Sequence, residues 1–339
     1  MKTVLKWVFL AVSLFAVSTV FAQAKSATSA MKMLIGNSTA NDAQAAVCNK
    51  FAELVTKYSG GRIQATAHHG ESLGNNVQML AALQAGSIHG MSTLAGFISA
   101  MVPELSLFDL PYLLPGSPAG ITAFTAQSKA AAKLRELAER KGIHIIDFNG
   151  IGHQNLLTKF PVNKLADIQG KKIRVIPSPI RIGAYQDWGA VVRPMEFGEV
   201  YSALQQGTID GIENPPDTVY KAKFHEAANY YTITEHTAVV NNVIVSKKWF
   251  DGLPKDLQDV VTKAGKDTIA FADEAFSNAQ NSSLEELKKR ITVTSMPAAE
   301  IQKMKDLAYK GVWERMKNDP QKGPIVKLLQ EDVARYGKR

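Results

Sequence analysis

The sequence predicts an α/β protein of two lobes with a cleft between them, and three observations support this fold class. One motif occurs twice: ALQAGSIHG at residues 82–90 and ALQQGTIDG at residues 203–211 match at six positions. Each copy reads as a helix end, a glycine suited to positive φ, and a short apolar strand. Apolar runs alternate with amphipathic segments, as in a mostly parallel sheet covered by helices. The length of 339 residues also suffices for two domains.

The first 22 residues read as a cleaved signal peptide. Lys2 and Lys6 precede an uncharged apolar run at residues 7–21, and the small residues Ala22 and Ala24 offer cleavage sites. A membrane anchor is the weaker interpretation, because the run is shorter than the ~20 residues that span a bilayer. Removal of residues 1–22 leaves 317 residues with a formal charge of +6. We therefore expect a soluble, exported protein of the periplasm.

Strands and helices alternate through the first half of the exported chain. The double glycine at residues 60–61 closes the first expected helix, and prolines mark a loop at residues 103–118. Strands are expected at 31–35, 63–67, 87–93 and 143–148, and helices at 41–59, 76–85 and 129–141.

The same alternation restarts after Gly150 and then gives way to helices. Pro254 suits the first position of a long helix that tolerates Gly265. Strands are expected at 156–158, 172–176, 191–192, 208–212 and 239–245, and helices at 182–188, 198–206, 254–290, 298–317 and 324–336. Because the C-terminal third of the chain is expected to be helical, it cannot form a third sheet domain, and we expect it to brace the two lobes.

Composition excludes several classes of function. The basic residues are scattered without interleaved aromatic residues, which favours a solvated surface over nucleic-acid binding. Cys48 is the only cysteine, so no internal disulfide can form, and its apolar neighbours at helical spacing predict a helix position without chemistry. His68 and His69 would point to opposite faces of a strand, and no metal-binding or phosphate-binding motif occurs. We therefore predict no metal and no cofactor.

One motif is compatible with an enzyme. The segment GESLG at residues 70–74 fits the Gly-x-Ser-x-Gly pattern, so a secreted serine hydrolase using Ser72 is the alternative function. A nucleophile elbow needs its helix directly after the serine. Here Gly74 and Asn75 intervene, and asparagine is a helix N-cap residue. The pattern therefore favours a simple turn.

The second copy of the repeat lies beside more informative residues. Arg174 stands inside a β-branched strand, where periodicity alone favours an outward-facing side chain. The functional interpretation is a guanidinium that binds a carboxylate in a cleft. Asn214 follows the strand at residues 208–212 and would either offer an amide to the same anion or form the turn before Pro215.

The runs DIQGKKIRV at residues 167–175 and PMEFGEVYSALQQGTIDGIEN at residues 194–214 make the chain resemble a known family. It is similar to the periplasmic substrate-binding proteins of tripartite ATP-independent periplasmic (TRAP) transporters. The resemblance implies two α/β lobes joined by crossing strands and braced by a long helix, with the ligand sealed between them. It places lobe I at residues 25–151 plus 240–279 and lobe II at residues 152–239 plus 280–333.

The resemblance also implies a function. The protein would be a monomeric, non-enzymatic receptor for a small monocarboxylate, such as a sugar acid, hydroxy acid or keto acid. It would deliver this ligand to the membrane subunits of a TRAP transporter, although a receptor that serves a signalling system shares the same fold.

The resemblance assigns roles to individual residues. Arg174 and Asn214 match the family's partners of the ligand carboxylate, Phe197 matches an apolar wall, and Asn37 lies where a strand of lobe I meets the ligand. Many members carry a second arginine about twenty residues before the first. This sequence has none there and offers His153 or Gln154, which argues against dicarboxylates. Asn76 and Thr93 complete the candidate binding residues, and the first repeat has His89 where the family usually has aspartate.

Overall fold

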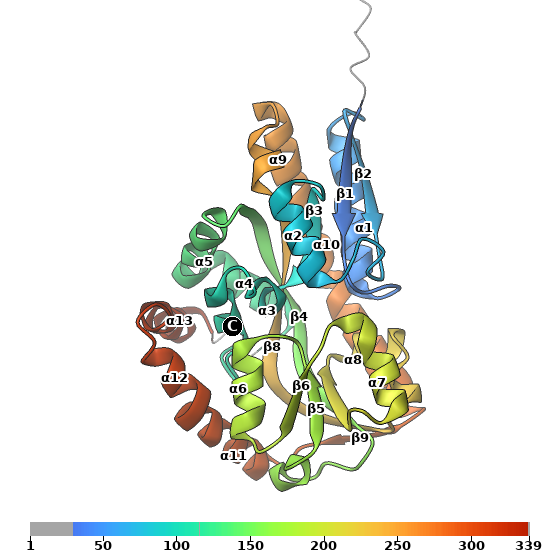
Figure 1. Cartoon of the computed structure of the whole chain (residues 1–339), viewed down its shortest axis with the longest axis vertical. Coiled ribbons are helices and arrows are strands. Elements are labelled where there is room, and N and C mark those ends of the chain that lie inside the picture. The colour runs from blue at the N-terminus through green and yellow to red at the C-terminus, as the bar shows by residue number, and fades with distance from the viewer. Residues whose placement is uncertain (1–29, 115, 338–339) are drawn as a thin grey trace, which may run out of the picture.

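The computed structural model describes residues 30–114 and 116–337. The predicted signal peptide lies outside these residues. Within them no helix is both long enough and apolar enough to cross a membrane. The predicted α/β class is confirmed, because helices cover both halves of an extended sheet (Figure 1).

All strands of the described chain belong to one nine-stranded sheet in the order β2-β1-β3-β8-β4-β7-β5-β6, with β9 paired to β8. Pairing is parallel within each half, for β1 with β2 and β3 and for β5 with β6 and β7. It is antiparallel where the halves meet. The strands are β1 Met31–Gly36, β2 Ile63–His68, β3 Gly90–Leu94, β4 Ile143–Thr158, β5 Lys172–Val175, β6 Val191–Pro194, β7 Gly211–Asn214, β8 Tyr230–Ser246 and β9 Thr292–Ser295.

Two long strands cross between the halves, and the sequence-based prediction of them was wrong in extent. Residues 143–148 and 156–158 were expected as separate strands, but β4 runs through both, since Gly150 and Gly152 are accommodated in an irregular pairing with β8. The strand expected at residues 239–245 begins earlier, at Tyr230. The last of three irregularities in this pairing, between Gln154 and Leu156, marks where β4 leaves the first half and pairs with β7.

The long bracing helix is present as α10 (Lys255–Lys288), which contacts α1, α4, α8 and β4. In Figure 1 it extends from the upper half, near α1, to the lower half, near α8. Gly265 of α10 allows close approach to β4, because a Cβ there would lie 2.4 Å from Ile146 Cγ2. The other α-helices are α1 Ala43–Tyr58, α2 Asn76–Ala85, α3 Ala95–Ile98, α4 Pro118–Gln127, α5 Lys129–Glu139, α6 Pro179–Asp187, α7 Val200–Gln206, α8 Pro216–Lys221, α9 Lys247–Asp251, α11 Ala298–Ala308, α12 Glu314–Lys317 and α13 Gly323–Tyr336.

Both copies of the sequence repeat adopt the same local structure. Gly86 and Gly207 end α2 and α7 with φ values of 85° and 76°, as the motif predicts. The following strands start at Gly90 and Gly211, later than expected. The reason is that Ser87 and Thr208 donate backbone and hydroxyl hydrogen bonds to the last turns of α2 and α7. They therefore belong to the helix caps and not to the strands.

Other differences are local. The sequence did not predict α4 or β9, and the helix expected at residues 298–317 is interrupted by a π-helical turn, Tyr309–Trp313. Cys48 is buried in α1, as expected, and burial raises the pKa of its thiol to about 12. The thiol is therefore protonated and unreactive at neutral pH.

Candidate functional site

A small cavity of about 30 Å³ lies between the two halves of the molecule. It is bounded by the loop after β1, the start of α1, the crossing strands and the ends of β5 and β7. The residues that line it are Ser38, Thr39, Gln44, Leu94, Phe97, Ile151, Gln154, Arg174, Ile176, Phe197, Asn214, Pro215, Thr218 and Val239. Apolar walls with a few convergent polar groups are typical of small-molecule sites.

Arg174 supplies the charge of this cavity. Its side chain is fully buried, so the outward-facing interpretation was wrong. Nε and Nη2 donate to the carbonyl oxygen of Met195 at 3.1 and 2.7 Å. None of the ion pairs found in the described chain includes this guanidinium, and burial lowers the pKa of Arg174 to about 10. A buried cation without a carboxylate partner is costly, so the cavity is suited to an anion.

Two amides adjoin Arg174. In the β5–β7 register Arg174 lies beside Ile212, so Asn214, two residues further along β7, lies on the same face of the sheet. Asn214 Oδ1 and Gln154 Oε1 are buried and have no partner in the described protein. Because amide oxygen and nitrogen positions are assigned from the hydrogen-bond network, each group can offer a donor or an acceptor. Such groups can form hydrogen bonds with the ligand but carry no charge that would balance a second carboxylate.

His153 and Gln154, the two residues that could replace the missing second arginine, lie on opposite faces of the crossing strand β4. Gln154 lines the cavity, whereas His153 lies in an open groove of about 750 Å³ and its Nε2 donates to the carbonyl oxygen of Leu114 at 2.8 Å. Successive strand residues point to opposite faces, which accounts for the difference. The structure therefore brings Gln154, and not His153, to Arg174.

Of the remaining predicted residues, some line the cavity and others hold the structure around it. Phe197 lines the cavity. Asn37 does not; it donates to Thr39 Oγ1 at 2.9 Å and accepts from His69, and so orders the loop that carries Ser38 and Thr39 to the cavity.

Asn76 and Thr93 also lie away from the cavity wall. Thr93 Oγ1 donates to Asn76 Oδ1 at 3.0 Å, and Asn76 Nδ2 donates to Glu196 Oε2 at 3.2 Å. Among the lining residues that the sequence analysis missed, Ser38 and Thr39 follow the end of β1 after Asn37. Their place at the carboxyl end of a parallel strand was the one signal that could have identified them.

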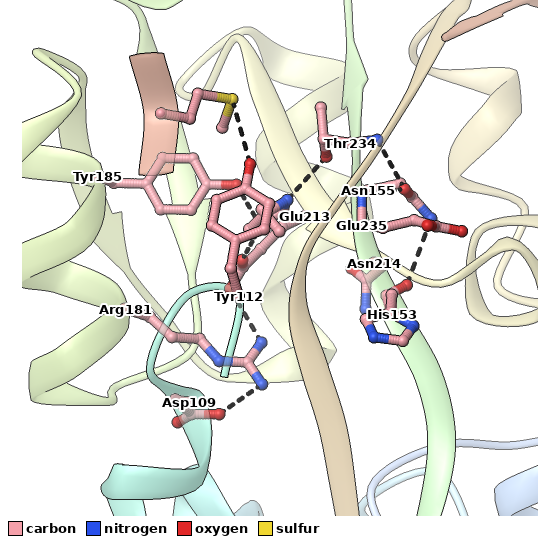
Figure 2. A network of polar contacts seen from close by, with 12 residues as sticks. Asp109, Tyr112, His153, Asn155, Arg181, Tyr185, Glu213, Asn214, Thr234 and Glu235 are labelled. Atoms are coloured by element: carbon pink, nitrogen blue, oxygen red, sulfur yellow. Dashed lines mark hydrogen bonds and ion pairs between the residues drawn. The ribbon is translucent and has the colours of Figure 1, made fainter. Parts of the chain in front are cut away.

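A buried charged network lies behind the end of β7. Arg181 of α6 donates to Glu213 Oε1 at 2.9 Å and to Asp109 Oδ1 at 2.8 Å (Figure 2). His236 of β8 lies 2.9 Å from Glu213 Oε2. Burial by itself would raise the pKa of Glu213, but Arg181 and His236 lower it to about 2. The network fixes the residue next to Asn214, and no motif in the sequence indicated it.

Ser72 does not occupy a nucleophile elbow. It lies exposed on a turn, and α2 begins only at Asn76, after the N-cap Asn75. The ring of His69, the histidine nearest in sequence, is bound to Asn37 and Asn49 instead. The turn interpretation is confirmed by this geometry, and the hydrolase alternative has no structural support.

A cavity between two α/β halves, joined by crossing strands and braced by one helix, defines the class of extracytoplasmic solute receptors. Comparison with known proteins gives the family. Residues 36–319 match the bacterial extracellular solute-binding proteins of family 7, and the chain belongs to this family. The resemblance to TRAP solute-binding proteins is thereby confirmed, and the predicted periplasmic location agrees with the names of the relatives.

Named relatives differ in their ligands. The C4-dicarboxylate-binding periplasmic protein of Rhodobacter capsulatus is 31% identical over 70% of this chain and 72% of its own length. The ectoine/5-hydroxyectoine-binding periplasmic protein of Ruegeria pomeroyi is 28% identical over 75% of each chain.

Solved structures share the complete fold. A TRAP periplasmic solute-binding protein from Desulfovibrio salexigens with bound orotic acid has a TM-score of 0.85 and 29% identity, covering 90% of this chain and 99% of its own. The sugar acid binding protein of Advenella mimigardefordensis in complex with galactonate has a TM-score of 0.84 and 26% identity, covering 89% and 99%.

Proposed function

We propose that this protein binds a small organic monocarboxylate at Arg174 and presents it to the membrane subunits of a TRAP transporter. The observation that carries the proposal is the fully buried guanidinium, which has a carbonyl oxygen and no carboxylate as its partner among the described residues. A ligand carboxylate would neutralise this charge through the bidentate geometry that arginine favours. The bound acids of related structures support a carboxylate ligand.

The charge balance of the cavity supports one carboxylate rather than two. Arg174 is the single ionisable residue among those that line the cavity. Glu213 and Glu196 lie near enough to raise its pKa against the effect of burial, so they already compensate part of its charge. A second carboxylate would meet the neutral amides of Gln154 and Asn214 and would be buried unpaired.

Binding would occur between the lobes whose boundaries the sequence predicts, residues 25–151 plus 240–279 and residues 152–239 plus 280–333. The cavity takes lining residues from both segments of the chain. The receptor would act as a monomer and would carry out no reaction on its ligand. Ser38, Gln44 and Thr218 join the predicted residues as polar groups that can contact the ligand body.

A ligand screen with matched arginine variants tests the proposal. Mature protein is unfolded and refolded to remove bound ligand, then titrated with hydroxy, keto, sugar and dicarboxylic acids. A ligand at one hundred times its Kd should raise the stability by about 2.7 kcal/mol. Arg174→Ala should abolish this ligand-induced stabilisation. Arg174→Lys should weaken it, because lysine lacks the planar guanidinium that binds a carboxylate through two hydrogen bonds.

Arg193 provides the control. It pairs with Arg174 in the register of β5 and β6 but is exposed, so Arg193→Ala should leave binding unchanged. Binding of an acid that survives in Arg174→Ala would overturn the proposed site, and the absence of any acid ligand would overturn the proposed function.

A further inference from the structure

Among the hydrogen bonds that join the two predicted lobes, three beside the cavity link a carboxylate of one lobe to an uncharged N–H group of the other. Asp217 Oδ2 accepts from the backbone N–H of Ala43 at 2.9 Å. Glu196 Oε2 accepts from Asn76 Nδ2 at 3.2 Å, and Glu71 Oε1 accepts from the backbone N–H of Gly198 at 3.3 Å. Carboxylates are supplied from both sides: Glu71 lies on lobe I, whereas Asp217 and Glu196 lie on lobe II. None of these three carboxylate residues is among those that line the cavity.

The Asp217 contact is the most buried of the three. Asp217 is 2% exposed, and its second oxygen accepts from Ser283 of α10 at 3.0 Å. Ala43 is the first residue of the 16-residue helix α1, so its N–H has no partner within the helix. The positive end of the α1 dipole adds to the attraction for a carboxylate. Separation of the lobes would return both groups to water.

The other two contacts form a group at the edge of the cavity. Thr93 orients Asn76 toward Glu196, as described above. Burial raises the pKa of Glu71, and the neighbouring carboxylates of Glu196 and Glu199 raise it further, whereas the N–H of Gly198 opposes both effects. Closing the lobes therefore brings like charges together, and the two hydrogen bonds compensate for that repulsion.

We propose that Asp217, Glu196 and Glu71 are positioning residues that set ligand affinity by holding the lobes closed without touching the ligand. The inference rests on the proposed function of the cavity. A ligand enters while the lobes are apart, and these contacts form when the lobes close. They therefore act on the rate of release and leave the rate of entry nearly unchanged.

Ala43→Pro removes one contact with little change to the fold. Proline is favoured at the first position of a helix, and Asp42 before it has the extended conformation that a following proline needs (φ −101°, ψ 178°). The substitution deletes the N–H group that donates to Asp217, and the proline Cδ takes the place of its hydrogen, so Asp217 must also move away. We expect ligand release to become at least about tenfold faster, because a hydrogen bond to a charged group is lost and the ring crowds the closed state. The melting temperature of the ligand-free protein should stay unchanged.

A double-mutant cycle tests the second contact. Glu196→Ala and Asn76→Ala should each accelerate release, and the double variant should release no faster than the worse single variant, because both remove one interaction. Glu199→Gln is the matched control, because Glu199 is an exposed acid of the same segment and accepts no hydrogen bond from lobe I in the described chain. Its release should be no faster than that of the wild type, because loss of this charge only removes repulsion of Glu71.

A distance measurement separates the two proposals. Spin labels at Lys57→Cys on α1 and Gln206→Cys on α7, both exposed, report the fraction of closed molecules in the Cys48→Ser background. Ala43→Pro should lower the closed fraction with or without ligand. If wild type binds an acid but Ala43→Pro and Glu196→Ala match it in release rate and closed fraction, the positioning role is wrong and the binding function stands. If no acid binds, the proposed function fails, and an unchanged closed fraction would also overturn the positioning role.

Discussion

His89 and Asp210 make the same contact in the two copies of the sequence repeat. The N–H of Leu34 in β1 donates to His89 Nδ1 at 3.0 Å, and the N–H of Lys172 in β5 donates to Asp210 Oδ2 at 2.8 Å. The backbone N–H of each residue returns a bond to the carbonyl oxygen of the same strand residue. A histidine therefore replaces the carboxylate in the first copy, and it can accept this bond only while Nδ1 is unprotonated.

This equivalence predicts how variants of His89 behave. His89→Asp should keep the contact, whereas His89→Leu leaves the Leu34 N–H without a partner and should cost about 1–3 kcal/mol. Burial lowers the pKa of His89 in the folded protein, so the folded state binds this proton less readily than the unfolded state. Wild type should therefore lose stability as the pH falls below about 6.5, and His89→Asp should lose less, because His69 and His236, whose pKa values burial also lowers, still contribute. Urea unfolding at pH 7.5 and 5.5 measures both effects, and equal pH dependence in the two proteins would contradict the assignment.

The buried network predicts a large effect of Arg181. Arg181→Met leaves Asp109 and Glu213 buried without their cation, so the free energy of unfolding should fall by about 3–5 kcal/mol. Arg315→Met provides a control, because its ion pair with Asp187 is half exposed and should contribute at most about 1 kcal/mol. Chemical denaturation of both variants checks the contrast, and similar losses would show that the network does not support the fold.

The same network predicts acid sensitivity. The pKa of Glu213 is lowered to about 2 in the folded protein, from the ordinary value of 4.5 for a glutamate side chain, so the folded state holds this carboxylate ionised. Its contribution is complete above about pH 4.5 and is lost as the pH falls toward 2. Glu213→Gln should therefore be less stable than wild type at pH 7, and the difference should shrink below pH 4.5. A difference that grows on acidification would reverse the expected sign.

Close packing of α10 on β4 predicts a cost for filling Gly265. Alanine at this position would improve helix propensity by about 1 kcal/mol, but its Cβ would overlap Ile146 and overpacking costs about 1–3 kcal/mol. We expect Gly265→Ala to lower the melting temperature and the double variant with Ile146→Val to recover part of the loss. A melting temperature above that of the wild type would show that the two elements can separate freely.

Gln154 predicts a change of ligand class. Gln154→Arg places a second cation beside Arg174 in the cavity, so a dicarboxylate should gain affinity and a monocarboxylate should lose it. His153→Arg is the matched control, because that residue lies in the groove on the other side of β4. Titration of each variant with one acid of each class measures the effect. Equal changes in both variants would mean that Gln154 does not face the ligand.

The sequence predicted the parts of the fold that depend on short-range signals. The repeat, the glycine caps at Gly86 and Gly207 and the long helix follow from local chemistry, and the structure has them. The extent of β4 and β8 was missed because Gly150 and the polar run before Val239 interrupt the apolar pattern. Hydrogen bonding between β4 and β8, rather than the intrinsic β-propensity of their residues, keeps this part of the chain extended.

The candidate site shows the same limit. Arg174, Asn214, Gln154 and Phe197 could be named from sequence and resemblance, and all four line the cavity. The alternation of polar and apolar residues predicted an outward-facing Arg174, because such alternation cannot identify a strand that is buried on both faces. The contacts of Asp217 and of Arg181 join residues far apart in the chain, so no local pattern could have revealed them.

The crossing of β8 into the first half has a consequence for how this chain folds after export. One edge of β3 pairs with β1 and the other with β8, and residues joined at the β8 edge, such as Thr93 and Asn242, stand 149 positions apart. A chain that leaves the translocation pore from its N-terminus therefore holds one open edge of β3 until most of its length has emerged. Long-range pairing of this kind is slow, and an open strand edge invites aggregation. We expect secretion to depend on a factor that shields this edge until β8 arrives.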